Sequence, residues 1–113
     1  MAVAAAYIKR RASTHVKLRV AVLERLVLKA LLDVAREARG EVVTVTTAAV
    51  LRRALPGLRL APVYAQAAYA IIRASLAGVC QEEKRRATRW ICPREAMVQR
   101  VESLINGHGL GEG

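Results

Sequence analysis

The two cysteines of this chain enclose the stretch CQEEKRRATRWIC, residues 80–92, and their spacing constrains the fold more than any other feature. We predict a β-hairpin here, with a three-residue loop centred on Arg86. The facing pairs are then Lys84 with Thr88, Glu82 with Trp90, and Cys80 with Cys92. Opposed Cα atoms in an antiparallel pair lie about 4.5–5.5 Å apart, which a disulfide can bridge. The pattern predicts either a cross-link between the strands or two free, partly buried thiols, and it leaves both open.

Apolar periodicity and turn chemistry predict the elements before the hairpin. Residues 16–39 carry apolar side chains at helical spacing, and Gly40 follows them as a C′ glycine would. The β-branched run 42–45 indicates a strand. Thr46 or Thr47 then caps a short helix. The first half of the chain is therefore expected to fold as helix, strand, helix.

Prolines delimit the second half of the chain. Pro56 and Gly57 end the short helix in a turn, and Pro62 suits the first turn of a longer helix that ends near Leu76. After Pro93 the apolar spacing indicates an amphipathic closing helix. We therefore expect a third helix, the hairpin and a fourth helix in this order.

The first helix is apolar on two sides. Besides its main stripe it carries a second patch, made of Ala21, Leu28, Leu32 and Ala35. A helix of this kind usually packs on two sides. Either another segment covers the patch, such as the N-terminal AVAAAYI stretch or the last helix, or a second copy of the chain does. We expect a homodimer.

The net charge of +10, from 19 Lys and Arg against 9 Asp and Glu, predicts an anionic partner. Nucleic acid is the first candidate and an acidic membrane surface the second. No apolar run reaches the roughly 20 residues that span a bilayer. The opening MAVAAAYIKRRAS lacks the charge order of a signal peptide, so we expect a cytoplasmic protein that does not enter membranes.

Catalytic and metal-binding patterns are missing from the sequence. Zinc needs about four ligands at compact spacing, and Cys80, Cys92, His15 and His108 do not provide them. No glycine-rich phosphate loop and no nucleophile with a positioned base can be identified. We expect no enzyme, no catalytic residue, no metal, no cofactor and no small-molecule substrate.

Three segments carry a resemblance to a known superfamily: VVTVTTAAVLRRALPG, APVYAQAAYAIIRASLAGV and CQEEKRRATRWIC. With the order of elements, they resemble the winged helix-turn-helix superfamily, in particular small archaeal members with a long first helix, many of which are dimeric DNA binders. The resemblance implies a mainly α fold with a small β-hairpin (α+β). It would span residues 16–105, between a basic arm (1–15) and a flexible glycine-rich tail (106–113).

The composition adds a suggestion about the source. Arg outnumbers Lys by 15 to 4, and asparagine occurs once, at Asn106. This balance points to a GC-rich genome, and the scarcity of thermolabile amides is typical of thermophiles.

The superfamily usually places its third helix in the major groove and its wing on the backbone or in the minor groove. Carried over to this chain, the candidate DNA-binding residues are Arg52, Arg53, Arg59, Gln66, Tyr69, Arg73, Lys84, Arg85, Arg86 and Arg89. The inward stripe of the third helix is then Ala67, Ala68, Ile71, Ile72, Ala74 and Leu76, with Tyr64 partly buried. Amides and guanidinium groups suit bases and phosphates, although each candidate could equally be an ordinary solvated residue.

We make specific predictions for two residues of the hairpin, Glu83 and Trp90. Glu83 is expected to pair across the strands with Arg89, which leaves the tip basic. Trp90 could stack on a nucleotide, but packing in the core is favoured.

The leading expectation is a double-stranded DNA-binding protein, either a transcription regulator or a chromosome-associated protein of the nucleoid. The alternative is a winged-helix adaptor in a transcription or replication assembly. RNA binding is less favoured, because single-strand readers use several aromatic platforms and this chain has four aromatic residues in total.

Overall fold

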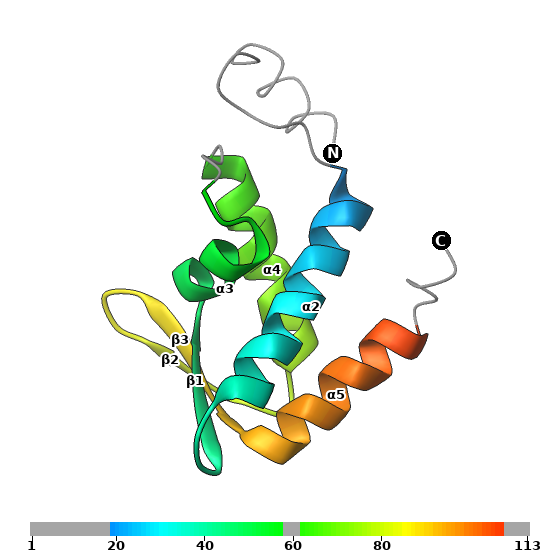
Figure 1. The fold of residues 1–113 in the computed structure, drawn as a ribbon. Helices are drawn as coiled ribbons and strands as arrows, with labels where there is room; N and C mark the ends of the chain where they lie inside the picture. Colours follow the sequence, from blue (N-terminus) through cyan, green and yellow to red (C-terminus); the bar gives the residue numbers. More distant parts are fainter. Residues whose placement is uncertain (1–18, 58–61, 108–113) are drawn as a thin grey trace.

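The computed structural model describes residues 19–57 and 62–107. In these ranges the fold is mixed α+β, with four helices and a three-stranded antiparallel sheet (Figure 1). The elements are α2 (Val20–Glu37), β1 (Val42–Thr46), α3 (Thr47–Ala54), α4 (Pro62–Leu76), β2 (Gln81–Lys84), β3 (Thr88–Pro93) and α5 (Arg94–Gly107). The basic arm 1–15, Arg59, and the tail from residue 108 onward lie outside the described residues.

The sheet has the strand order β1-β3-β2, so β3 is its central strand. The hairpin register agrees with the prediction, since Glu82 faces Trp90 and Lys84 faces Thr88. The pairing of β1 with β3 was not predicted. It sets Val45 opposite Trp90, with both side chains buried. The hairpin is therefore anchored to the helical body through β3.

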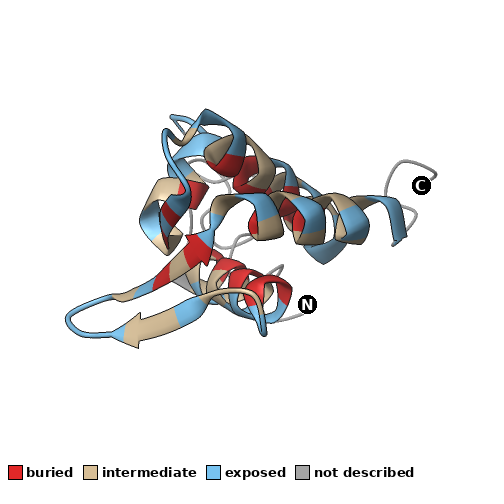
Figure 2. Cartoon of the chain, turned by 90° about the horizontal axis from the view of Figure 1, so that it is seen from below, coloured by how far each residue is buried: buried red, intermediate tan, exposed pale blue. Residues whose placement is uncertain are grey.

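The core lies between α2, the sheet and the two later helices. Its largest fully buried side chains include Trp90, Tyr64, Leu23, Leu31 and Met97. Figure 2 shows buried positions on the inner sides of the helices and at the base of the sheet, whereas the hairpin tip is exposed. Burial of large aromatic and aliphatic side chains is the main favourable contribution to folding, so this core fixes where the hairpin points.

The helix α2 ends at Glu37, two residues before the predicted end. Ala38 already has extended backbone angles, φ −65° and ψ 139°, so Gly40 is not the C′ residue. The guanidinium of Arg94 instead binds the end of the helix, because it donates from Nε to the carbonyl of Ala35 (2.9 Å) and from Nη2 to that of Arg36 (3.2 Å). Gly40, at φ 92°, turns the chain toward β1.

A second arginine of α5 binds the end of α4. The Nη1 of Arg100 donates to the carbonyl of Ala77 (2.8 Å) and to that of Ser75 (3.3 Å). Cations are favourable at helix C-termini, where backbone carbonyls lack partners within the helix. Two cations of the basic chain therefore serve to dock α5.

Several predicted boundaries are confirmed. The Oγ1 of Thr46 accepts a hydrogen bond from the backbone N–H of Ala49 at 3.2 Å and caps α3. The helix α4 begins at Pro62 and ends at Leu76, and Gly78 follows at φ 80°. Within residues 19–57 and 62–107, no helix combines the length and the apolar character needed to cross a membrane.

The second apolar patch of α2 is partly covered inside a single chain. Leu28 is 2% exposed and Ala35 is fully buried, whereas Leu32 is half-buried and Ala21 is exposed. The helix α5 packs along α2 in Figure 1. For Leu28 and Ala35 the alternative that the same chain covers the patch therefore holds, whereas Ala21 and Leu32 keep exposed surface.

Candidate nucleic-acid interface

The hairpin of β2 and β3 projects from the helical body (Figure 1). At its base, Cys80 and Cys92 form a disulfide, with the Cα atoms 4.3 Å apart. Cys92 is fully buried beside β1, where it faces Val43. Of the two alternatives in the sequence, the structure has the cross-linked form.

Two arginines at the hairpin tip lack a carboxylate partner within residues 19–57 and 62–107. Arg85 and Arg86 are exposed, and neither makes an ion pair with another described residue. The predicted cross-strand pair is confirmed, because Arg89 Nε lies 3.0 Å from Oε1 of Glu83. Lys84 is also compensated, with Nζ 3.6 Å from Oε2 of Glu82. The free positive charge of the hairpin is thus concentrated at its tip.

The exposed face of α4 differs in part from the predicted one. Gln66 and Arg73 are exposed as expected, but Tyr69 is half-buried, with its ring centroid 5.6 Å from that of Trp90. Ala74, predicted to point inward, is exposed. The reason is that the apolar core contacts of α4 follow one row of side chains at a spacing of four residues. This row consists of Tyr64, Ala68, Ile72 and Leu76.

Trp90 belongs to the core and not to the surface. It is 2% exposed, and its indole N–H donates to Oε1 of Glu82 at 3.1 Å. The expectation of packing is confirmed, and stacking on a nucleotide would require the ring to leave the core.

Glu82 connects the hairpin to α4, a role that the sequence did not reveal. Its Oε1 lies 3.2 Å from the Nε of Arg73 in addition to its bond with Trp90. The predicted register already set Glu82 opposite Trp90, but nothing local in the sequence indicates that α4 passes close to this strand.

The two arginines of α3 have different environments. Arg53 donates from both terminal nitrogens to the carboxylate of Glu37, at 2.7 and 2.6 Å, and so ties α3 to the end of α2. Arg52 is exposed and makes no ion pair with the described residues. Arg59 lies outside the described residues. Among the candidate cations that can be examined, Arg52, Arg85 and Arg86 are the uncompensated ones.

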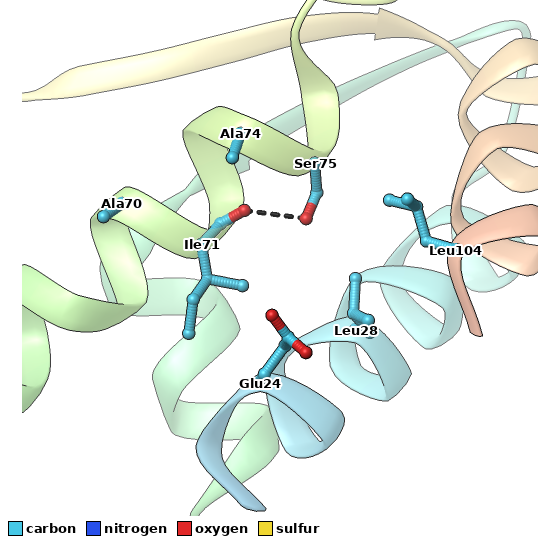
Figure 3. Close-up of a pocket in the computed structure, with 7 residues that line it drawn as sticks. All are labelled: Glu24, Leu28, Ala70, Ile71, Ala74, Ser75 and Leu104. Carbon is cyan, nitrogen blue, oxygen red and sulfur yellow. Dashed lines mark hydrogen bonds between the residues drawn. The ribbon is translucent and has the colours of Figure 1, made fainter. Parts of the chain in front are cut away.

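A groove of about 350 Å³ lies on another side of α4, between α2 and α5 (Figure 3). Its lining residues are Glu24, Leu28, Ala70, Ile71, Ala74, Ser75 and Leu104. The hydroxyl of Ser75 is used internally, since it donates to the carbonyl of Ile71 at 2.7 Å. The groove is therefore mainly apolar, with the carboxylate of Glu24 as its charged group.

Groups of three or more His, Cys, Asp or Glu side chains that could hold a metal do not occur within residues 19–57 and 62–107. His15 and His108 lie outside these ranges. The chain matches no protein-family model, no curated protein and no solved structure. The resemblance to the winged helix-turn-helix superfamily therefore stays an expectation from the sequence.

Proposed function

We propose that this protein binds double-stranded DNA through a winged helix-turn-helix arrangement, as a transcription regulator or a chromosome-associated protein. In this proposal α4 docks in the major groove and the β2–β3 hairpin lies on the phosphate backbone. The observation that carries the proposal is the projecting hairpin tip, where Arg85 and Arg86 are exposed and form no ion pair with the described residues.

The chemistry of the neighbouring elements supports this docking. Guanidinium groups bind phosphate oxygens bidentately, and each phosphate contact releases condensed counterions from DNA. Gln66 offers an amide on the exposed face of α4, and Arg52 adds an uncompensated cation on α3. Phosphate contacts would set the position of the protein, and Gln66 is the side chain best suited to read a base.

The disulfide at the hairpin base supports the same proposal. It joins the two strands where the hairpin leaves the body, so the tip arginines have a fixed point of attachment. Less conformational entropy is then lost when the tip binds phosphates.

Fluorescence anisotropy of a labelled random-sequence duplex, measured at four salt concentrations, tests the proposal. We expect affinity to fall steeply, with a log-log slope of several units. Unlabelled duplex DNA should compete better than structured RNA. Absence of binding at low salt would contradict the proposal.

A second candidate function is that of a protein-interaction adaptor, and the groove of Figure 3 favours it. Its apolar walls and the carboxylate of Glu24 suit a partner segment with an apolar side chain next to a cation. Light scattering separates the two candidates. A stable homodimer that covers Ala21 and Leu32 would agree with the dimeric DNA binder, whereas a monomer would favour the adaptor.

A further inference from the structure

Glu82 contacts three donors, one on each of α4, β2 and β3. Its Oε1 accepts from the indole N–H of Trp90 (3.1 Å) and lies 3.2 Å from Nε of Arg73 on α4. Its Oε2 lies 3.6 Å from Nζ of Lys84, two residues further along the same strand. The carboxylate of Glu82 therefore links the hairpin to α4.

The carboxylate is shielded, whereas its cations are not. The side chain of Glu82 is 21% exposed, against 56% for Arg73 and 61% for Lys84. Trp90 holds the carboxylate from the core side, because its ring is buried and its N–H has no other acceptor among the described contacts. Arg73 and Lys84 can thus turn toward an incoming anion while Glu82 stays in place.

We infer that Glu82 is a positioning residue that competes with DNA phosphate for Arg73 and Lys84. This role of Glu82 rests on the proposed DNA binding. It specifies which carboxylate limits the strength of the phosphate contacts. In the free protein the carboxylate of Glu82 holds the side chains of Arg73 and Lys84 in position. In the complex the same carboxylate repels the DNA phosphates, because its negative charge remains close to them.

The expected consequence is a limit on affinity for any duplex. Contacts to phosphate carry no sequence information and supply most of the affinity for non-specific DNA. A carboxylate that weakens these contacts therefore lowers the affinity for non-specific DNA but leaves the contribution of base contacts largely unchanged. Glu82 would then improve the ratio of specific to non-specific binding at the expense of total affinity.

Glu82→Gln tests this inference, because glutamine keeps an oxygen for the indole N–H and removes the charge. We expect the variant to bind a random duplex about five- to tenfold more tightly near 0.1 M salt, with a salt dependence steeper by about one unit. Glu83→Gln is the matched control. It removes the same charge from the adjacent residue, whose side chain alternates to the other face of the strand and is paired with Arg89 instead of Arg73. We expect a gain of at most about twofold.

A double-mutant cycle with Arg73→Gln links the effect to the observed ion pair. If Glu82 acts on Arg73, the gain from Glu82→Gln should shrink to less than half, on a logarithmic scale, in the Arg73→Gln background. Melting curves and the emission of the single tryptophan verify that each variant folds.

Three outcomes would overturn the inference. The first is Glu82→Gln binding no more tightly than the wild type. The second is an equal gain from Glu83→Gln, and the third is a gain independent of Arg73. If the wild type fails to bind duplex DNA at low salt, the proposed function itself is wrong, and the wild-type measurement distinguishes that case from the other three.

Discussion

The guanidinium of Arg94, the first residue of α5, donates to the backbone carbonyl of Ala35 at 2.9 Å across 59 residues of sequence. Ala35 is fully buried in the last turn of α2. The same guanidinium reaches the carbonyl of Arg36. One side chain therefore binds the end of α2 and fixes the start of α5, which makes α5 an integral part of the fold.

Arg94→Ala should lower the free energy of unfolding by about 2 kcal/mol, because two helix carbonyls lose charged donors. Urea denaturation measures this change. Arg25→Ala is the control, since Arg25 is exposed on α2 without an ion pair to the described residues, and it should change stability by less than about 0.5 kcal/mol. Equal effects of the two variants would contradict a capping role for Arg94.

The Cys80–Cys92 cross-link should raise the free energy of unfolding by about 3 kcal/mol, because it restricts the unfolded chain. The two cysteines are separated by 12 residues in the sequence. Adding a reductant should lower the melting temperature of the wild type. The double variant Cys80→Ser, Cys92→Ala should melt at that lower temperature with or without reductant. Titration of two free thiols in the native, non-reduced protein would contradict the prediction.

Trp90 should behave as a core residue in solution. Its fluorescence should be blue-shifted and weakly quenched by iodide, because the ring is 2% exposed and its N–H is bonded to Glu82. Addition of duplex DNA should leave the emission nearly unchanged. Strong quenching by DNA would show that the ring stacks on a nucleotide.

Thr46→Ala should destabilise the protein by about 1 kcal/mol, because the N-terminus of α3 loses its side-chain cap. Thr46→Ser keeps the hydroxyl and should recover most of the loss in thermal melts. Thr47→Ala is the control, because Thr47 is the neighbouring threonine. A loss of stability in Thr47→Ala as large as that in Thr46→Ala would show that the effect does not come from the cap.

Much of the fold could be predicted from local patterns. The hairpin register follows from a loop centred on Arg86, the start of α4 from Pro62, and the cap of α3 from Thr46. Each of these depends on residues close together in the sequence. Their physical causes act over a few positions. These causes are the alternation of side chains along a strand, the fixed φ of proline and the capping of free N–H groups.

The errors come from contacts between distant segments. The helix α2 ends at Glu37, two residues before the predicted end, and the side chain that binds its last carbonyls, Arg94, comes from the far end of the chain. The exposure of Ala74 depends on which row of α4 faces α2, and two rows of this alanine-rich helix were nearly equivalent in the sequence. Local patterns cannot show such choices, since tertiary packing decides them.

The candidate site was predicted less completely than the fold. The sequence identified the cations and one ion pair, Glu83 with Arg89. It did not show the partners of Arg53 and Arg73, which it therefore grouped with Arg52, Arg85 and Arg86. Only the structure separates the residues that Glu37 and Glu82 compensate from those left free. Pairing depends on the position of whole helices, which composition and spacing do not determine.

Two matched triple variants show whether the uncompensated arginines bind DNA phosphates. The first combines Arg52→Ala, Arg85→Ala and Arg86→Ala. The second combines Arg25→Ala, Lys29→Ala and Arg39→Ala, which removes the same charge from other exposed positions without an ion pair to the described residues. Both are compared with the wild type by fluorescence anisotropy on a random duplex across several salt concentrations.

We expect the first variant to bind about 100-fold more weakly than the wild type, with a log-log salt slope lower by about two to three units. The second variant should stay within a few-fold of the wild type. Equal losses in the two variants would show that only the total charge matters, and an unchanged affinity of the first variant would contradict docking through the hairpin tip and α3.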